Sequence, residues 1–393
     1  MQQSKLWTRE FTLLTLTNMF YVFGFYMLMP TVPLFVKSLS GTDADAGIVA
    51  ASFTISAIIM RFFSPLLLTK LTKRTMLRLG ITLSSIVTAA CGLAFSIPTA
   101  LLFRVFQGFG FGIVSTICAT FAADLLPDSR RGEGIGYFGM GTTAMVAFSP
   151  AIGLFLARNS SFTTMFFVAA AGQLVSLAIM TAFSPPAELN RTAPKLKSPK
   201  LLLRNLFEPT LTLQIVLLIL FGICRSAEQN FLSLVADERG IALSSYFIFQ
   251  TAVSFVAKFI TGKLYDRRGH AWAVISGGGS LFFALTIMSL AKTLPVMLIA
   301  GFFSGFGMGA LLPAMQSWTL TSLESERRSV ASAIYYNYYD IGISVGSIAL
   351  GYIAKGLGYV STFRTAAVVV IVFLTVYITT MLSRRRNAKG LKH

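Results

Sequence analysis

A few charged side chains lie inside long apolar runs of the sequence: Arg104, Arg225, Glu228 and Asp340. A charge near the centre of a bilayer costs roughly 3 kcal/mol or more, so such residues usually face a cavity or a partner. Carboxylates in apolar surroundings can exchange protons near neutral pH, because burial disfavours their charged form. We therefore treat Asp340 and Glu228 as candidate proton-coupling residues, with Arg104 as a buried charge that would tune them.

Asp340 lies in the stretch YYNYYDIGISVGS. Tyr336, Asp340 and Ser344 recur every four residues and form a polar stripe on an otherwise apolar helix. Two interpretations stay open. Asp340 is either a buried carboxylate satisfied by tyrosine and asparagine side chains, or a cavity acid that binds protons or substrate. The residues we expect to line a substrate cavity are Arg225, Gln107, Asn337, Tyr336, Tyr339, Ser344 and Trp318.

Arg225 and Glu228 are three residues apart and therefore share one helix face. They either neutralise each other or form a cavity pair that substrate or a proton opens. Arg104 has three interpretations: a functional charge, a side chain that snorkels to the membrane interface, or a partner in a structural pair. Gln107 follows one turn later and extends the hydrogen-bonding reach of Arg104.

The composition requires a lipid environment. The chain has 393 residues, of which 54% are hydrophobic and 12% charged, whereas soluble domains carry roughly 25% charged residues. The net charge of +18 on so apolar a chain does not indicate a nucleic-acid partner. Isolated cysteines and two histidines, one expected in a short loop at 270 and one at the C-terminus, give no metal-ligand spacing. We expect no metal, no cofactor and no enzymatic activity.

Apolar runs long enough to span a bilayer predict an all-α membrane protein with twelve transmembrane helices in two six-helix bundles. The predicted spans are 11–36, 46–69, 79–97, 99–126, 134–157, 162–183, 210–235, 242–264, 271–291, 293–323, 330–354 and 359–382. A proline-rich basic stretch, 184–209, separates a first bundle, 1–183, from a second, 210–393.

The positions of Lys and Arg orient these spans. The termini and the loops after even-numbered spans hold most of the basic residues, whereas the loops after odd-numbered spans hold only Lys37, Arg158, Arg239, Lys292 and Lys355. Basic loops stay on the cytoplasmic side. We expect a multi-pass protein of the plasma membrane with both termini and the 184–209 linker in the cytoplasm.

The two halves repeat at an offset of 197 residues. The run RVFQGFGFG at 104–112 aligns with GFFSGFGMG at 301–309, so that Arg104 falls on Gly301. Gly108 with Gly112, and Gly305 with Gly309, form small-residue faces for close helix packing. Related halves predict a pseudo-symmetric transporter with a site near the midplane. The G-x-G-x-x-G at 134–139 follows no strand, which excludes a dinucleotide site.

Three motifs resemble those of the major facilitator superfamily. KFITGKLYDRRG at 258–269 is similar to its signature loop, RVFQGFGFG to the fourth-helix motif whose arginine is tied to proton coupling in antiporters, and SPAIG at 149–153 to the fifth-helix motif of exporters. In the first-half copy of the loop, RFFSPLLLTKLTKR, the carboxylate is missing, and Asp124 or Asp128 can replace it electrostatically. The resemblance implies gating or conformational roles for Arg61, Lys73, Arg74, Asp124, Arg130, Arg131, Lys258, Gly262, Asp266, Arg267, Gly269, Arg327, Arg328, Pro150 and Gly153.

These motifs resemble the twelve-helix drug:proton antiporter branch. The resemblance and the charge pattern predict alternating-access efflux of a small amphipathic or anionic or zwitterionic molecule in exchange for protons. Uniport or proton-coupled uptake of a small metabolite is the alternative, and a transporter-like sensor or scaffold is a remote one. The expected partners are the small-molecule substrate, protons and the lipid bilayer, with the protein acting as a monomer.

Overall fold

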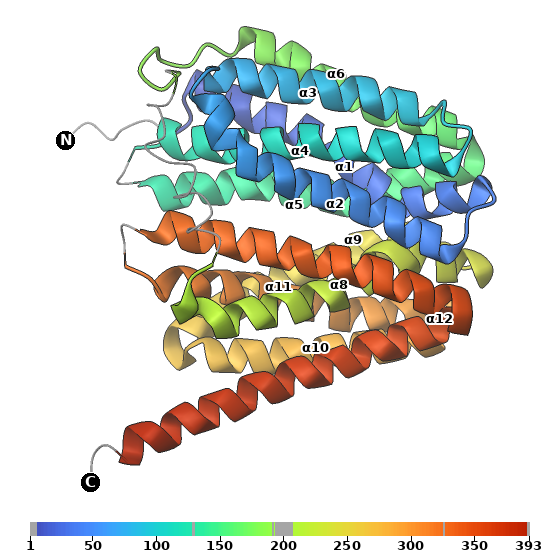
Figure 1. Ribbon diagram of the computed structural model, residues 1–393, viewed down its shortest axis with the longest axis vertical. Coiled ribbons are helices and arrows are strands. Elements are labelled where there is room, and N and C mark those ends of the chain that lie inside the picture. Colours follow the sequence, from blue (N-terminus) through green and yellow to red (C-terminus); the bar gives the residue numbers. More distant parts are fainter. Residues whose placement is uncertain (1–5, 128–129, 191, 193–206, 325–326, 391–393) are drawn as a thin grey trace. The chain divides into compact units, whose positions relative to one another are not determined.

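The computed structural model describes residues 6–127, 130–190, 192, 207–324 and 327–390; the side chains of 131, 132, 263, 266, 268, 328, 329 and 384–390 are not part of this description. The regular secondary structure of these residues consists of helices, without strands. The chain divides into two compact units, Met1–Pro199 and Lys200–His393 (Figure 1). The all-α membrane fold predicted from the apolar runs is therefore confirmed.

The first unit contains six long helices. They are α1 (Arg9–Ser38), α2 (Asp43–Leu68), α3 (Lys73–Cys91), α4 (Ile97–Leu125), α5 (Arg131–Asn159) and α6 (Phe162–Ala182). Polar N-caps fix several of their starts: Thr42 closes a capping box with Asp45, and the Thr72 hydroxyl accepts from the Thr75 amide. Such caps satisfy backbone donors that the first helical turn leaves unpaired.

The second unit begins with a 3₁₀ turn, η2 (Pro209–Leu211). It continues with α8 (Thr212–Glu238), α9 (Ser244–Arg268), α10 (His270–Leu290), α11 (Leu294–Thr321) and α12 (Arg328–Gly390). The α12 helix is interrupted by one non-helical residue, Gly358, with φ 77°. This break falls between the predicted spans 330–354 and 359–382, so the helices are consistent with twelve spans.

The third predicted span was misplaced. We expected 79–97, but α3 covers Lys73–Cys91. Thr72 starts the helix early and places Lys73, Arg74 and Arg78 in its first turns. Among the described residues, nine helices are long and apolar enough to cross a membrane by hydropathy alone. The charged ends of α3 and α9 explain why these two are not among them, and α12 is counted once.

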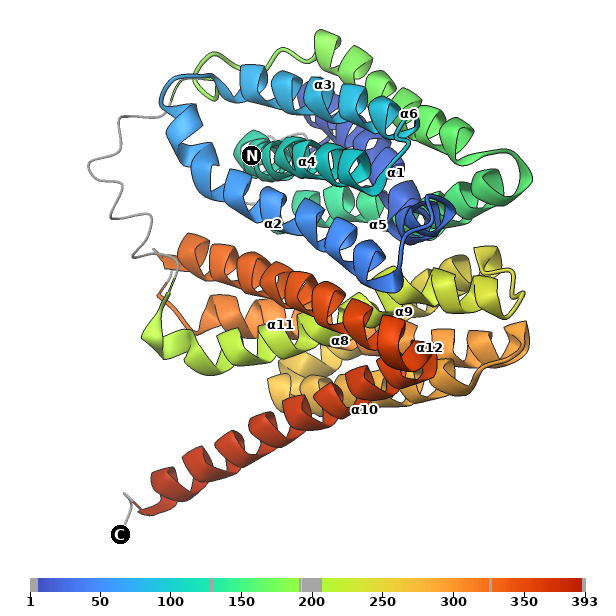
Figure 2. The same cartoon turned by 45° about the vertical axis from the view of Figure 1, so that its right-hand side comes forward.

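The same packing scheme appears within each unit. In the first, α4 packs against α2 and α3, while α1 packs against α5 and α6. In the second, α11 packs against α9 and α10, while α8 packs against α12 (Figure 2). The main helix pairs of the first unit thus have counterparts in the second, in agreement with the repeat.

The repeated glycines show this correspondence at atomic scale. A Cβ on Gly112 would meet the Ala57 carbonyl on α2, and a Cβ on Gly309 would meet the Ser254 carbonyl on α9. Ala57 and Ser254 are themselves 197 residues apart. Both glycines allow two helix backbones to approach closely, which is the usual role of small residues at helix–helix contacts in membranes.

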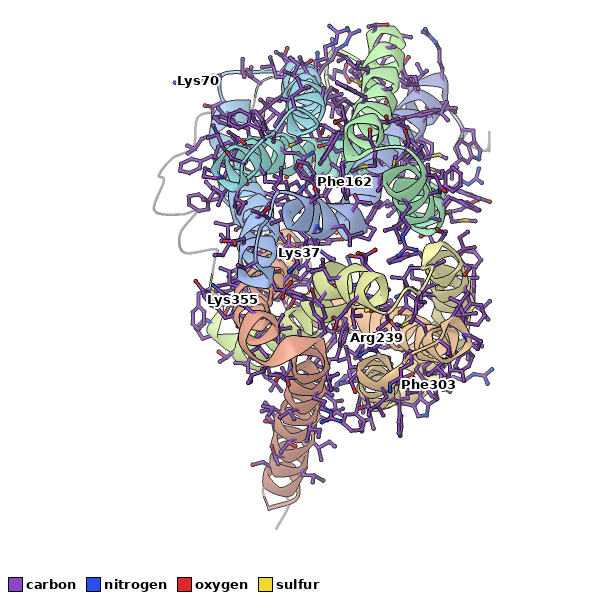
Figure 3. All side chains as sticks on the ribbon, turned by 90° about the vertical axis from the view of Figure 1, so that its right-hand side faces the viewer. Lys37, Lys70, Phe162, Arg239, Phe303 and Lys355 are labelled. Carbon is purple, nitrogen blue, oxygen red and sulfur yellow. The ribbon has the colours of Figure 1, made fainter. Side chains whose placement is uncertain are left out.

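Arg239 closes one end of the second unit. This residue is the C-cap of α8, and its guanidinium donates to the carbonyls of Met288 at 3.1 Å and Ser289 at 3.0 Å, and to that of Ala291 (Figure 3). These carbonyls lie at the C-terminal end of α10, where a cation complements the helix dipole. Arg239 therefore ties the α8–α9 connection to α10.

Candidate functional site

Glu228 is the centre of a buried polar cluster in the second unit. Its side chain is 1% exposed. Oε1 accepts hydrogen bonds from the Tyr246 hydroxyl at 2.8 Å and from Gln250 Nε2 at 2.6 Å. Oε2 accepts from the Ser304 hydroxyl at 2.7 Å. Three donors from α9 and α11 therefore converge on one carboxylate of α8.

Arg225 completes this cluster, which we call the Glu228 cluster: Glu228, Arg225, Tyr246, Gln250 and Ser304. Its Nη1 lies 2.7 Å from Glu228 Oε2. The Arg225 side chain is 20% exposed, in contrast to the enclosed carboxylate. This contact agrees with both interpretations of the pair, mutual neutralisation and a cavity pair that substrate or a proton opens. The arginine is thus the more exposed partner of the pair.

Sequence analysis missed Tyr246, Gln250 and Ser304. Each is an ordinary polar residue on an apolar helix, and each became significant only when α8, α9 and α11 were placed together. One signal was present in the sequence. Ser304 is the repeat counterpart of Gln107, the cavity candidate that follows Arg104 by one helical turn.

Arg104 lies in the corresponding region of the first unit, on α4. It is 7% exposed, and its Nη1 donates to Gln107 Oε1 at 2.5 Å. Gln107 Nε2 in turn donates to the Thr88 hydroxyl at 2.7 Å. The guanidinium also lies over the Phe53 ring, 4.3 Å from its centroid. Arg104 is therefore enclosed by its own unit and held by a cation–π contact and an amide.

No carboxylate neutralises Arg104 among the residues that the structure describes, and its Nε has no hydrogen-bond partner there. Buried charges are normally paired. Phe53 belongs to an aromatic cluster with Phe25 and Phe111, and Arg61 lies over the Phe111 ring at 5.7 Å. Two arginines of the first unit thus contact one group of stacked rings.

The polar stripe on α12 runs from the surface into the interior. Tyr336 is exposed, Asn337 and Asp340 are half-buried, and Ser344 is buried. The Ser344 hydroxyl donates to the Asp340 carbonyl at 2.9 Å. Tyr339 packs on Phe221 and stacks with Tyr335. The Asp340 side chain is neither fully enclosed nor fully exposed.

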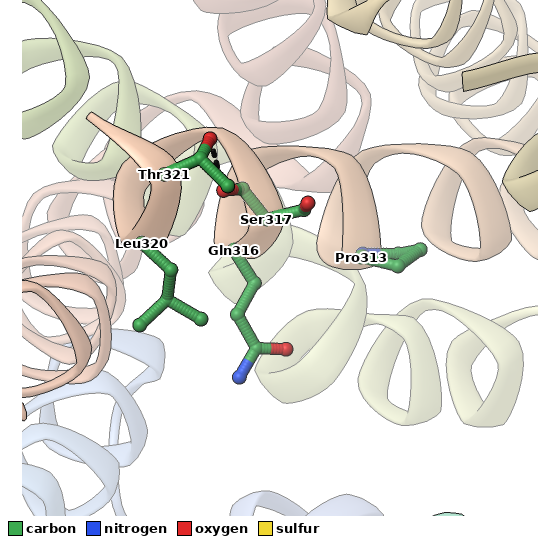
Figure 4. A pocket seen from close by; sticks show the side chains of 5 residues that line it. All are labelled: Pro313, Gln316, Ser317, Leu320 and Thr321. Atoms are coloured by element: carbon green, nitrogen blue, oxygen red, sulfur yellow. Dashed lines mark hydrogen bonds between the residues drawn. The ribbon is translucent and has the colours of Figure 1, made fainter. Parts of the chain in front are cut away.

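A hollow of about 350 Å³ lies along one face of α11. It is lined by Pro313, Gln316, Ser317, Leu320 and Thr321 (Figure 4). Gln316 Nε2 donates to the Tyr336 hydroxyl at 3.0 Å, which brings one cavity candidate to its edge. Trp318, another candidate, lies on the other side of this helix. It is 7% exposed and stacks on His270.

Lys73 and Asp124 form an ion pair in the first unit. Nζ of Lys73 is 2.6 Å from Asp124 Oδ2 and lies over the Phe121 ring. The pair gives Lys73 of the first-half loop a carboxylate partner from α4. Asp128 lies outside the described residues. Arg74 Nη2 donates to the Thr181 carbonyl, and Arg130 pairs with Glu133 at 2.8 Å.

Arg327 pairs with Glu208 in the second unit. Its Nη2 is 2.5 Å from Glu208 Oε2, which joins the α11–α12 connection to the start of η2. Burial alone would raise the pKa of Glu208, but hydrogen bonds from Arg327 and Thr210 outweigh it and hold that pKa below its ordinary value.

The remaining gating candidates are scattered. Gly269 ends α9 with φ 74°, a backbone conformation that favours glycine. Lys258 is half-buried, whereas Gly262 and Arg267 are exposed. A Cβ on Gly153 would meet the Met27 carbonyl, so Gly153 and its buried neighbour Pro150 lie against α1. The side chains of Arg131, Asp266 and Arg328 lie outside the description.

One histidine was misassigned. His270 was expected in a loop but is the first residue of α10, where Tyr377 and Trp318 contact it. Among the described residues no group of three His, Cys, Asp or Glu side chains could hold a metal ion.

Bacterial drug-resistance proteins are similar to this chain. It is 23% identical over 347 residues to the quinolone resistance protein NorA of Staphylococcus aureus (strain MRSA252), covering 85% of this chain and 87% of that one. It is 29% identical over 403 residues to the multidrug resistance protein MdtG of Enterobacter lignolyticus (strain SCF1), covering 97% and 93%. These relatives extend over nearly the whole of both units.

Solved structures have the same fold. A POT family transporter in complex with 5-aminolevulinic acid matches with a TM-score of 0.81 and 14% identity, over 96% of each chain. The human organic anion transporter MFSD10 matches with a TM-score of 0.68 and 15% identity, over 94% of this chain and 98% of that one. The sequence model of the Major Facilitator Superfamily matches residues 14–283 and 236–393. With its motifs, paired units and relatives in agreement, the chain belongs to the Major Facilitator Superfamily of membrane transporters.

Proposed function

We propose that the protein expels a small amphipathic molecule from the cell in exchange for protons. The observation that carries this proposal is the ion pair between enclosed Glu228 and partly exposed Arg225. A proton and a basic group of the cargo can each replace Arg225 at this carboxylate. Two ligands that compete for one group weaken each other's binding, and that competition is the basis of antiport in an alternating-access transporter.

Arg104 supports a second requirement on the cargo. It is a buried cation without a carboxylate partner in the described part of its unit, and it lies beside stacked aromatic rings. An anionic group on an aromatic body complements both features. The proposed cargo is therefore a small amphipathic molecule that carries a basic, an acidic or a zwitterionic polar group. The drug-resistance names of the relatives favour efflux over uptake.

Transport in proteoliposomes tests the proposal. Purified protein is reconstituted with the pH dye pyranine inside the vesicles. Ethidium serves as cationic probe, norfloxacin as zwitterionic probe and carboxyfluorescein as anionic probe. We expect an imposed pH gradient to drive probe movement, and the probe to move protons the opposite way. Probe flux that moves protons in the same direction would indicate uptake, and flux indifferent to pH would indicate uniport.

Variants assign the coupling residue. Glu228→Gln should abolish movement driven by the pH gradient while retaining passive exchange of the probe. Glu238→Gln is the matched control, because Glu238 is exposed at the end of the same helix. Asp340→Asn decides the role of the second acid. Loss of pH-driven flux with retained exchange adds Asp340 to the coupling, and unchanged flux removes it.

A further inference from the structure

Tyr246 is enclosed and bonded to the carboxylate at the centre of the Glu228 cluster. It lies in the first turn of α9 and is 0% exposed. Its hydroxyl donates to Glu228 Oε1 at 2.8 Å. Gln250 lies one turn later on the same helix and reaches the same oxygen at 2.6 Å. The register of α9 therefore sets both contacts at Oε1.

The Tyr246 ring occupies a space that is filled by different side chains in the two units. A Cβ on Gly301 would come within 2.9 Å of Tyr246 Cε2. The counterpart of Gly301 in the first unit is Arg104, and the counterpart of Tyr246 is the smaller Val49. The first unit thus places an arginine side chain where the second places a tyrosine ring.

The four donors to Glu228 differ in what they can do once the carboxylate takes a proton. Gln250 Nε2 and Arg225 Nη1 can only donate, so neither can accept the new proton of a carboxylic acid. Ser304 Oγ already accepts from Gln250 Nε2 at 3.0 Å. A hydroxyl oxygen can accept as well as donate, so Tyr246 and Ser304 can each bond Glu228 in both its ionised and its protonated state.

We propose that Tyr246, placed in the space left by Gly301, is a positioning residue that sets the pH range over which Glu228 exchanges its proton. This inference rests on the proposed coupling role of Glu228. Bonds to an ionised acceptor are stronger than those between neutral groups. Removing the hydroxyl therefore weakens the ionised state more than the protonated one, and Glu228 takes up its proton at higher pH.

Other titratable groups near the cluster are few. Arg225 lies on the same helix, α8, and its Nη1 faces the carboxylate. From α12, which packs against α8, Tyr339 interacts electrostatically with Arg225. The α11 helix contributes Ser304 and contains no titratable residue in Leu294–Thr321. Tyr246 is the titratable contact from α9.

Tyr246→Phe is the direct test. Ethidium-driven proton movement is measured in proteoliposomes at a series of pH values. We expect the pH midpoint to move to higher pH by about one unit, which corresponds to roughly 1.4 kcal/mol between the two states. A role limited to packing would lower the rate at every pH and leave the midpoint unchanged. That second result would overturn the inference.

Gly301→Ala tests the same point without altering any hydrogen-bonding group. The new methyl group displaces the Tyr246 ring, so we expect a midpoint shift in the same direction as in Tyr246→Phe. Gly279→Ala, on α10, is the control, because its Cβ would meet nothing within 4 Å. A wild-type midpoint in Gly301→Ala, together with one in Tyr246→Phe, rejects the positioning role.

A spectroscopic titration separates this inference from the proposed function. Infrared difference spectra follow the protonated-carboxyl band that disappears in Glu228→Gln, and they need no transport. If Glu228→Gln retains full pH-driven flux, the coupling role of Glu228 fails. If Glu228→Gln abolishes that flux but Tyr246→Phe leaves the band's midpoint unchanged, only the role of Tyr246 fails. Should Tyr246→Phe not fold, Gly301→Ala decides by the same band.

Discussion

His270 lies flat on Trp318, with ring centroids 4.3 Å apart and an interplanar angle of 8°. The repeat counterparts of these two residues, Lys73 and Phe121, also contact each other, with Nζ 5.7 Å from the ring centroid. Each unit therefore places a basic residue at the start of its third helix over an aromatic ring of its fourth. Tyr377 adds a 2.8 Å hydrogen bond to His270 Nδ1.

Replacing His270 should destabilise the second unit selectively. His270→Ala removes a stacked pair and a hydrogen bond, and we expect a loss of about 2 kcal/mol in the free energy of unfolding. Thermal unfolding can be followed with a thiol-reactive dye, because Cys224 is buried in the second unit and Cys91 and Cys118 in the first. In a variant that retains only Cys224, its exposure should begin at lower temperature. Earlier exposure of Cys118 instead would contradict this.

The Lys73–Asp124 pair should contribute modestly to the stability of the first unit. The two side chains are 20% and 31% exposed, so solvent screens part of their attraction. A double-mutant cycle with Lys73→Gln and Asp124→Asn should give a coupling energy of about 0.5–1 kcal/mol. This coupling should decrease at high salt. Additive single effects, measured through Cys118 exposure, would show that the pair contributes nothing.

Acid should remove the contribution of the Glu208–Arg327 pair. The pKa of Glu208 is lowered in the folded protein, so its stabilisation is complete above the ordinary glutamate pKa of about 4.3 and disappears as pH falls through the lowered value. Wild type should therefore exceed Glu208→Gln in Tm at pH 7, and the difference should close below about pH 4. A difference that stays constant with pH would attribute it to packing.

Substitution of the repeated glycines should be costly. A Cβ on Gly108 would overlap Ser56 Oγ and the Phe53 carbonyl, whereas one on Gly139 would meet nothing within 4 Å. Overpacking of this kind costs about 1–3 kcal/mol or more. Gly108→Ala should lower Tm and Gly139→Ala should leave it unchanged or raise it slightly. Equal stability of the two variants would mean that α2 and α4 separate easily.

Much of the fold was predictable because lipid imposes simple rules. Apolar runs located the spans, and the offset of 197 residues predicted two related halves, whose main helix pairs correspond in the structure. The predicted limits of α3 were wrong because the charged residues Lys73 and Arg74 lower the local hydropathy, so the predicted span began after them. The structure places both residues in the helix. A capping threonine, not the apolar run, decides where that helix begins.

The polar clusters were only partly predictable. Arg225 and Glu228 were paired from their spacing on one helix, which is a local relationship. Tyr246 and Ser304 reach the same carboxylate from two other helices, and their distance in the sequence from Glu228 carries no information about contact. The sequence does indicate a space beside Gly301, because glycine stands there where the first half has an arginine. It does not indicate that the Tyr246 ring occupies this space.

The break at Gly358 restricts how the last two spans can move. Only one residue, Gly358, departs from helical geometry, so no flexible loop separates the two segments of α12. A tilt of the segment that carries Asp340 must therefore either rotate the two backbone dihedrals of Gly358 or move the following segment with it. That following helix bears Tyr377, which is bonded to His270. If the two segments move together, a displacement beside Asp340 is therefore transmitted through Tyr377 to the first turn of α10.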